Sequence, residues 1–480
     1  MANEFNNKVV SATKWSAITE VCARLFMPIS GLVLARLLTP EAFGIVATLT
    51  MIITLADIFS EAGFQKFIIQ HEFRDEDETK KYSTVAFWSN IILSLCIWGG
   101  IAIFKDQLAV IVGSPGYGNV LLIACANIPL VGFSSIQTAI YRRDLNFKTL
   151  FYVRISTIIV PLVITIPLAF ILRSFWALVI GTLAKNLLSS LVLLYYSKWK
   201  PTFFYSCKIL KDMLSFSLWS MVETLSIWLN QYADVFIIGT LLSSHFLGLY
   251  KTTITTVGQM IGIVTSILTP VIFSTLSRLQ SNDKDFFNMY FKFQKVVAIL
   301  VLPIGTIVFA EKELVTSILL GSQWSETAGF MGLWALMGSI SVALSRYCTE
   351  MYRAKGHPML CFLVQFLMFI VLVPGVLYTA RIGFKELYIF RSLLELEYIV
   401  VNVIICYILF KLSPFQHITN ILRPIIASIV VLAFILILKP IYESVLYQIV
   451  ISALGFLIYC SVIYSSKEDR KLILNHILKR

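Results

Sequence analysis

Charged residues are scarce in this sequence. They make up 14% of the 480 positions, hydrophobic residues make up 58%, and the mean hydropathy is +0.82. About a quarter of the residues in soluble domains are charged, so this composition excludes a soluble globular protein. Long loops are also missing, because the apolar runs follow one another with connections shorter than about 20 residues, too short for a folded catalytic domain. The sequence therefore predicts a polytopic membrane protein.

Several chemical motifs are absent as well. The sequence has no G-x-x-x-x-G-K-[ST] loop to cradle a triphosphate, which argues against an ATPase. Its eight cysteines have no C-x-x-C spacing and its five histidines have no H-E-x-x-H spacing, so we expect no metal site. We expect no cofactor either. Any transport must draw its energy from a gradient or from the flux of the substrate.

Apolar runs dominate what is present. A run of about 20 residues crosses a bilayer core of roughly 30 Å, and about fourteen such runs occur. The fold class predicted is all-α, with about 14 transmembrane helices. The predicted spans are 13–37, 42–64, 83–104, 118–140, 150–172, 175–196, 213–240, 246–276, 289–310, 328–351, 358–380, 386–410, 422–441 and 445–465.

The distribution of basic residues predicts the orientation. Most of the 39 Lys and Arg residues fall on one side of the membrane if the amino terminus is inside, and cytoplasmic loops are enriched in these residues. We therefore expect both termini to be cytoplasmic. This asymmetry and contact with anionic headgroups account for the net charge of +12, so nucleic acid is not an expected partner. The first apolar segment is too long for a signal peptide and contains the charged residues Glu20 and Arg24. We therefore expect it to stay as a transmembrane helix.

An internal repeat divides the chain. The sequence LLTPEAFGIV at 37–46 returns as LLSSHFLGLY at 241–250, and Trp15-Ser16 returns at the same offset as Trp219-Ser220. Six predicted spans separate the copies, so the two halves enter the membrane in the same direction, as a parallel repeat. The predicted domains are an amino-terminal six-helix lobe at 1–196, a cytoplasmic linker at 197–212, a second six-helix lobe at 213–410, and two additional helices with a tail at 411–480.

Ionisable residues inside the spans are the candidate functional groups. Each charge at mid-membrane costs about 2.5–3.5 kcal/mol, so these residues must be paired, snorkelling or facing water. One interpretation is that they pair as interhelical contacts, and the other is that they line a hydrated cavity between the lobes. The helical spacings pair Glu20 with Arg24, Asp57 with Glu61, Glu223 with Asp234, Arg346 with Glu350 and Arg391 with Glu395, and leave Lys185 alone.

Several segments resemble a known family. The sequence is similar to the polysaccharide-transporter branch of the multidrug/oligosaccharidyl-lipid/polysaccharide exporter superfamily, which includes the Wzx-type O-antigen and capsule flippases. The resemblance covers nearly the whole chain. The matching segments are VLARLLTPEAFGIVAT at 33–48, SEAGFQKFIIQ at 60–70, STVAFW at 83–88, YRRDLNF at 141–147, DVFIIG at 234–239, FLGLY at 246–250, FSTLSRLQ at 273–280 and GSQW at 321–324.

The resemblance implies a V-shaped two-lobe protein of the bacterial cytoplasmic membrane that moves an undecaprenyl-diphosphate-linked oligosaccharide to the outer leaflet. A diphosphate that crosses hydrocarbon needs buried cations, and arginine suits it best. The substrate-binding residues implied are Arg24, as the first diphosphate contact, with Lys185, Arg346 and Arg391. Glu20 would orient Arg24, while Asp57, Glu223, Asp234 and Glu395 would line the cavity or couple an ion. The additional helix pair would accommodate the prenyl tail.

Other functions remain alternatives. An ion-coupled multidrug antiporter of the same superfamily would normally have twelve spans and an acidic cavity. A polysaccharide polymerase would need a sizeable external loop, which the sequence lacks. A non-transporting scaffold would have no use for buried charge. If the resemblance holds, a polymerase and a chain-length regulator are the expected protein partners.

Overall fold

The computed structural model describes residues 2–61, 63–197, 199–441 and 444–466. Within these ranges, the side chains of residues 2–10, 12, 13, 17, 21, 25, 215–220 and 223 are not described. Every regular element in the described residues is helical. The chain divides into two compact units: unit 1 ends at Gly248 and unit 2 begins at Leu249. The lobe boundaries that the repeat predicts, with the second lobe beginning at 213, stay a prediction.

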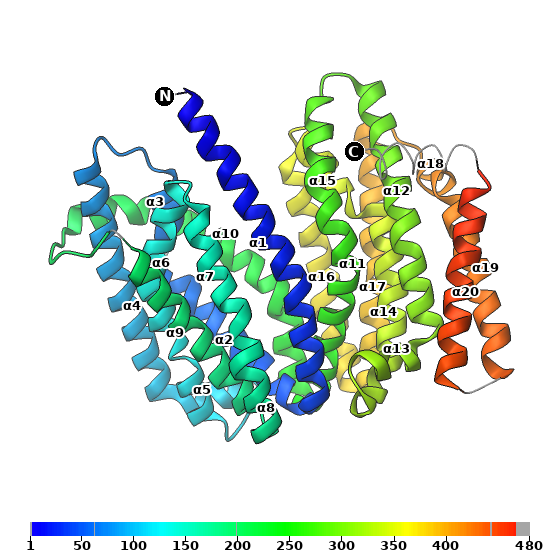
Figure 1. Cartoon of the computed structure of the whole chain (residues 1–480), viewed down its shortest axis with the longest axis horizontal. Helices are drawn as coiled ribbons and strands as arrows, with labels where there is room; N and C mark the ends of the chain where they lie inside the picture. Colours follow the sequence, from blue (N-terminus) through cyan, green and yellow to red (C-terminus); the bar gives the residue numbers. More distant parts are fainter. Residues whose placement is uncertain (1, 62, 198, 442–443, 467–480) are drawn as a thin grey trace. The chain divides into compact units, whose positions relative to one another are not determined.

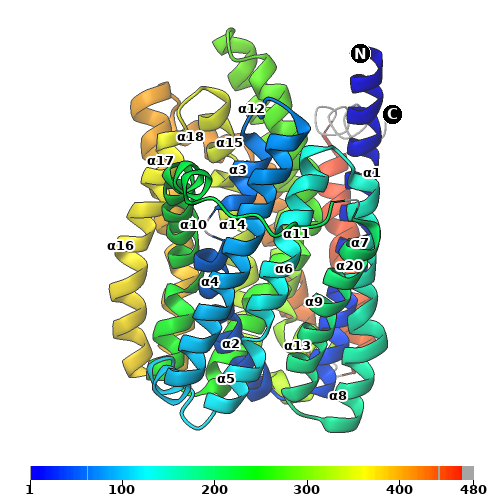
Figure 2. The ribbon, with the colours of Figure 1, turned by 90° about the vertical axis from the view of Figure 1, so that its left-hand side faces the viewer.

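Unit 1 is a bundle of long helices with short connecting helices between them. Figures 1 and 2 show α4 beside α6, which in turn packs against α9. The long helix α10 packs against α2, α3 and α4. The elements are α1 (Ala2–Leu37), α2 (Pro40–Glu61), α3 (Phe64–Gln70), α4 (Glu76–Ile111), α5 (Gly118–Ala124), α6 (Asn127–Arg143), α7 (Phe147–Val160), the π-helix η1 (Pro161–Thr165), α8 (Ile166–Leu172), α9 (Trp176–Tyr196) and α10 (Cys207–Leu241).

Unit 2 begins within α11 (Ser244–Arg278), and its centre is formed by α12 (Asp283–Ala310), α14 (Ala328–Ser341) and α17 (Phe384–Phe410), which pack together. The other elements are α13 (Lys312–Leu319), the 3-10 helix η2 (Ser322–Thr327), the π-helix η3 (Val342–Arg346), α15 (Cys348–Ala354), α16 (Pro358–Ile382), α18 (Pro414–Asn420), α19 (Leu422–Leu438), the 3-10 helix η4 (Lys439–Ile441) and α20 (Val445–Tyr464).

The helices are those of a multi-pass membrane protein. Thirteen segments among the described residues are long and apolar enough to cross a membrane, and each matches one predicted span. The remaining predicted span, 213–240, lies within α10, which is not among the thirteen, so the count of fourteen stays a prediction. Large apolar side chains such as Ile103, Ile171 and Met359 are exposed. Since water would disfavour such surfaces, a lipid environment accounts for them.

Local sequence signals explain how the connecting segments are built. Asp75 caps α4 by accepting a hydrogen bond from the Glu78 amide at 2.7 Å, and Glu78 Oε2 accepts one from the amide of Arg74, the residue before the cap, at 2.6 Å. Both bonds hold the chain at the start of the helix. Arg143, in the YRRDLNF segment, donates from Nη1 to the carbonyls of Ile68 and His71, at 2.7 and 2.6 Å. This arginine therefore satisfies carbonyls at the end of α3 that would otherwise lack partners.

The two copies of the repeat loop contact each other in unit 1. A Cβ placed on Gly44 would lie 1.7 Å from the Ser244 carbonyl oxygen, and a Cβ on Gly248 would lie 1.7 Å from the Pro40 carbonyl oxygen. Both pairs are related by the repeat offset, because 248 − 44 and 244 − 40 are each 204. The starts of α2 and α11 thus cross in a symmetric contact that only glycine permits.

The additional helices α19 and α20 pack on α12. Ala427 and Val431 of α19, with Ile451 of α20, form one buried cluster with Ile299 of α12. The Tyr459 hydroxyl group donates to the Ile299 carbonyl oxygen at 3.0 Å. The pair is therefore joined to unit 2 by a well-packed apolar core rather than by a polar surface.

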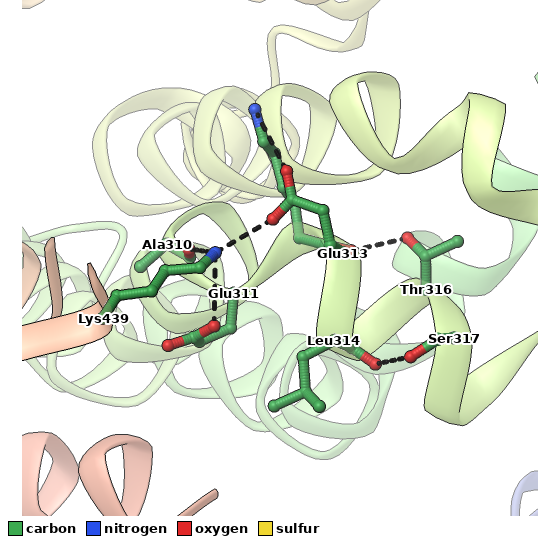
Figure 3. Close-up of polar contacts among 8 residues, drawn as sticks. Ala310, Glu311, Glu313, Leu314, Thr316, Ser317 and Lys439 are labelled. Carbon is green, nitrogen blue, oxygen red and sulfur yellow. Dashed lines mark hydrogen bonds and ion pairs between the residues drawn. The ribbon is translucent and has the colours of Figure 1, made fainter. Parts of the chain in front are cut away.

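A polar cluster connects the end of α19 with the segment between α12 and α13. Lys439 Nζ lies 2.9 Å from Glu313 Oε2 and 3.4 Å from Glu311 Oε2, and it donates to the Ala310 carbonyl oxygen at 2.9 Å (Figure 3). Burial raises the pKa of Glu311 above its usual 4.5, although Lys439 opposes the shift. Burial also disfavours ionised Glu313, but hydrogen bonds from Lys439 and from the backbone bring its pKa below 4.5.

These opposite shifts predict opposite pH dependences. Glu311 binds its proton more tightly in the folded state, so its contribution to stability is present below about pH 4.5 and is lost as the pH rises through the folded pKa. Glu311→Gln should therefore become increasingly stabilising, relative to wild type, between pH 4.5 and pH 8. Glu313→Gln is the matched control, and it should be mildly destabilising at pH 8 and neutral at low pH. Thermal unfolding midpoints across this range test both; equal pH profiles for the two variants would contradict the assignment.

Candidate functional site

A cavity of about 400 Å³ lies within unit 2. It is lined by residues from α11, α14, η3, α15 and α17, and charged residues line part of its wall. The lining residues are Ile254, Val257, Gly258, Ile261, Gly262, Thr265, Thr269, Trp334, Gly338, Val342, Arg346, Tyr347, Thr349, Glu350 and Glu395.

The wall contributed by α11 follows from helical spacing. Ile254, Gly258, Ile261 and Thr265 recur at intervals of three and four residues, which places them on one face. A Cβ on Gly258 or Gly262 would meet no atom within 4 Å. The glycines therefore leave open space where longer side chains would fill the cavity.

Arg346 is held at the cavity wall by an aromatic ring. Its guanidinium carbon lies 5.6 Å from the centroid of the Tyr398 ring, which is within range of a cation–π contact. The expected ion pair between Arg346 and Glu350 is not the one that forms. Glu350 instead pairs with Arg353, three residues later, at 3.1 Å. The helix is interrupted between the two residues, because η3 ends at Arg346, Tyr347 forms a turn with ψ −2°, and α15 begins after it. A spacing of four residues therefore does not place their side chains one above the other.

Arg391 forms a second cationic group beside the cavity. Its Nη1 lies 3.8 Å from Glu395 Oε1, which confirms the predicted pairing of these two residues. Its Nε donates to the Tyr250 hydroxyl group at 3.2 Å, and its guanidinium carbon lies 4.7 Å from the Trp334 ring centroid. The arginine is thus fixed by charge, hydrogen bonding and stacking together, and both Glu395 and Trp334 reach the cavity wall.

In unit 1 the predicted pair on α1 forms. Arg24 Nη2 lies 2.7 Å from Glu20 Oε1, one helical turn away, and both side chains are exposed. The role that the sequence suggested for Glu20, holding Arg24 in place, agrees with this geometry. Substrate contact by Arg24 stays a prediction.

The other candidates of unit 1 are dispersed. On α2, Asp57 Oδ1 is buried and accepts no hydrogen bond from any described residue, while Glu61 Oε1 accepts one from Gln65 at 2.9 Å. On α10, Asp234 is buried and accepts a hydrogen bond from the Val235 amide at 2.7 Å. Glu223 has a side chain outside the described residues, so the predicted pairing on this helix is not described.

Lys185 is a partly buried cation on α9. No hydrogen bond or ion pair of its ammonium group is found among the described residues. Its neighbour Asn186 instead donates to Asn127 Oδ1 at 3.0 Å. A cation held without an acidic partner in an apolar bundle is available to an anionic ligand.

Two tryptophan side chains of long helices, Trp15 and Trp228, pack within unit 1. The Trp228 indole donates to Thr54 Oγ1 at 3.1 Å, and the Trp15 ring lies 4.9 Å from that of Phe151. The Trp219 side chain lies outside the described residues. Helix packing therefore accounts for the two that are described.

Sequence reasoning missed the aromatic partners of the cavity arginines. Tyr398 follows Glu395 by three residues, so the helical spacing of α17 contained a signal for it. Trp334 and Tyr250 lie on other helices, and no local spacing connects them with Arg391. For metals, no group of three or more His, Cys, Asp or Glu residues in the described part of the chain is placed to hold an ion.

Comparisons with known proteins place the chain among polysaccharide export proteins. It is 21% identical over 339 residues to the lipopolysaccharide biosynthesis protein WzxC of Escherichia coli (strain K12), a match that covers 69% of this chain and 67% of WzxC. It is 24% identical over 317 residues to the succinoglycan biosynthesis transport protein ExoT of Rhizobium meliloti (strain 1021), covering 66% of this chain and 63% of ExoT.

Solved structures share the fold. The lipid II flippase MurJ in an inward closed conformation superposes with a TM-score of 0.75 at 12% identity, over 96% of this chain and 99% of MurJ. An inward-facing multidrug resistance transporter of the MATE family, in the MOP superfamily, superposes with a TM-score of 0.56 at 14% identity, over 85% of this chain and 98% of that one. The family model described as polysaccharide biosynthesis protein matches residues 33–329, more than half of the sequence. The chain therefore belongs to the polysaccharide biosynthesis protein family, in agreement with the resemblance of its motifs.

Proposed function

We propose that the protein is a flippase that moves an undecaprenyl-diphosphate-linked oligosaccharide across the bacterial cytoplasmic membrane by alternating access. The observation that carries this proposal is the 400 Å³ cavity of unit 2, with Arg346 on its wall and Arg391 beside it, in a chain of the polysaccharide biosynthesis family. The names of WzxC, ExoT and MurJ support the same substrate class.

The chemistry of the cavity suits a diphosphate headgroup. Moving a phosphate anion out of water is costly unless it is paired and hydrogen-bonded. Arginine is always ionised and presents a planar fork of donors that matches phosphate oxygens. Arg346 forms no ion pair with an acid in the described residues, so its donors are available to a ligand. Arg391 would add positive potential while Glu395 holds it in place.

Unit 1 supplies further groups to this proposal. Arg24 and Lys185 are its candidate phosphate contacts, and the Glu20 carboxylate would hold Arg24 when no substrate is bound. Asp57, Glu223, Asp234 and Glu395 are the acids available for cavity lining or ion coupling. The proposal also includes cytoplasmic termini, an interaction with a polymerase and a chain-length regulator, and accommodation of the prenyl tail by α19 and α20.

The experiment starts from deletion of the gene. We expect surface polymer to be lost and undecaprenyl-diphosphate-linked repeat units to accumulate at the cytoplasmic face. Wild type should restore export, whereas Arg346→Gln and Arg24→Ala should not. Hydrogen bonds to charged groups contribute about 1.5–3 kcal/mol, so each substitution should lower the transport rate about 10- to 100-fold.

The matched control is Arg381→Gln, since Arg381 is exposed at the end of α16 and lies outside the cavity. It should restore export as wild type does, at an equal amount of protein in the membrane. Unchanged polymer and carrier pools after deletion would contradict the flippase function, and drug-efflux assays would then test the antiporter. Normal export by the Arg346 and Arg24 variants would instead contradict only their assigned roles.

A further inference from the structure

A second pocket in unit 2 shares no lining residue with the cavity described above. Its volume is about 490 Å³, and it lies between the first half of α12 and the short helix α18. Figure 1 shows α18 at the same end of unit 2 as the beginning of α12. The lining residues are Asn288, Phe291, Lys292, Lys295, Gln416, Thr419 and Asn420.

Helical spacing directs polar side chains from both helices into this pocket. Asn288, Lys292 and Lys295 recur at four and three residues on α12, so they share one face. On α18, Thr419 and Asn420 lie three and four positions after Gln416, so these three side chains also share one face. Two facing polar surfaces therefore form the pocket.

Buried hydrogen bonds fix α18 against α12. Asn420 Nδ2 donates to the Phe291 carbonyl oxygen at 2.8 Å and to Gln294 Oε1 at 2.9 Å. Gln294 Nε2 in turn lies 3.5 Å from the His417 carbonyl oxygen. His417 is fully buried, and burial lowers its pKa, so the imidazole is neutral at pH 7. These hydrogen bonds between the two helices fix the walls of the pocket.

The lining chemistry selects an anion rich in hydrogen-bond acceptors. Lys292 and Lys295 supply two ammonium groups, and none of the seven lining residues is acidic. The Asn288 and Gln416 side chains add neutral amide donors. A phosphate group, with its negative charge and several acceptor oxygens, is the ligand class that uses the two ammonium groups together with these two amides.

A second face of α18 indicates where that phosphate comes from. Phe415 and Ile418 lie three residues apart on α18 and are 73% and 48% exposed, and Leu422, the first residue of α19, is 46% exposed. An exposed apolar face on a helix whose other face is polar lies at a membrane surface, and α19, a candidate span, begins directly after it. The pocket would then open into the layer of lipid headgroups.

We propose that this pocket binds the phosphate group of an anionic phospholipid and so anchors the α12–α18 corner of unit 2 at the membrane surface. This site is separate from the transport cavity and does not depend on the proposed function.

The test measures binding to the full-length protein in a neutral detergent. The probes are short-chain phosphatidylglycerol, inorganic phosphate, and monoolein, which has no phosphate. The test variant is Lys292→Gln with Lys295→Gln, and the control of equal charge is Lys80→Gln with Lys284→Gln, two exposed lysines outside the pocket. Each lysine near an anionic lipid surface contributes about 5-fold in affinity, so the test variant should bind phosphatidylglycerol about 25-fold more weakly than wild type.

A second variant, Thr419→Asp, keeps both lysines and places a carboxylate in the pocket, and it should abolish phosphatidylglycerol binding. Unfolding midpoints without lipid establish that each variant is folded. Binding of phosphatidylglycerol alone supports a lipid headgroup, whereas equally tight binding of inorganic phosphate supports a phosphate site filled from solution. The proposal is overturned if the test variant keeps wild-type affinity, if the control loses as much, or if monoolein binds as tightly as phosphatidylglycerol.

Discussion

Replacing Arg391 with methionine is expected to destabilise unit 2 by about 3–5 kcal/mol, because this is the typical cost of removing one partner of a buried ion pair. The Arg391 and Glu395 side chains are only 12% and 5% exposed. Without the guanidinium, the Glu395 carboxylate would stay buried with no counter-charge. The Tyr250 hydroxyl group and the Trp334 ring would also lose their contacts with the arginine.

A double-mutant cycle distinguishes this cost from simple loss of packing. Glu395→Met alone should also be destabilising, whereas the double variant should be within about 1–2 kcal/mol of wild type, since replacing both partners by apolar groups of similar volume is often neutral. Unfolding of the purified protein in detergent gives the four free energies. The double variant should nevertheless fail to export polymer, if Arg391 contributes to the substrate cavity.

The matched control is an exposed pair with the same spacing. Lys81 and Asp77 of α4 lie 3.2 Å apart at i,i+4, with side chains 53% and 74% exposed. Lys81→Met should cost no more than about 0.5 kcal/mol, because exposed ion pairs contribute little. Additive costs for Arg391 and Glu395, with no coupling between them, would show that the buried pair does not act as a unit.

The pair at 391 and 395 also shows how far the sequence predicts the site. Where a helix is regular, spacing alone identified the contact, as it did for Glu20 and Arg24. It failed for Arg346, because a turn at Tyr347 interrupts the helix between η3 and α15 and changes which side chains lie above one another. The apolar runs that predict helices contain no clear signal for such a turn.

Contacts between helices that are distant in sequence are a second feature of the site that the sequence did not predict. Trp334 lies 57 positions before Arg391 in sequence, yet its ring lies 4.7 Å from the guanidinium. Hydropathy predicted that both residues lie in membrane spans, but the meeting of two faces depends on how helices rotate against their neighbours.

Some residues of the motifs that reveal the family make structural contacts between helices. Arg143 of YRRDLNF binds carbonyls at the end of α3, and Gly44 and Gly248 of the repeated loops allow two helices to cross. Glu395 of the cavity wall and Arg391 beside the cavity lie outside every matching segment. The sequence therefore predicts the scaffold from its motifs, while the candidate site follows only from the cost of burying charge.

The glycine crossing carries the second large prediction. Gly44→Ala should destabilise unit 1 by about 3 kcal/mol, the upper end of the usual cost of overpacking. The added Cβ would lie 1.7 Å from the Ser244 carbonyl oxygen, and that oxygen belongs to backbone, which cannot rotate away as a side chain can. The better helix propensity of alanine, worth up to about 1 kcal/mol, offsets only part of this cost. Gly248→Ala should cost a similar amount, because its Cβ would meet the Pro40 carbonyl oxygen at the same distance.

The symmetry of the crossing makes the double variant informative. Once one alanine has forced α2 and α11 apart, the second meets an already widened gap, so Gly44→Ala with Gly248→Ala should cost less than the sum of the single changes. Gly99→Ala and Gly100→Ala on α4 are the controls, since a Cβ at either position meets nothing within 4 Å, and they should be neutral or slightly stabilising. Unfolding midpoints and the yield of folded protein in membranes measure all five variants. If the destabilisation by Gly44→Ala with Gly248→Ala equals the sum of the two single effects, the two glycines accommodate separate contacts. The two repeat copies would then not share one helix crossing at this position.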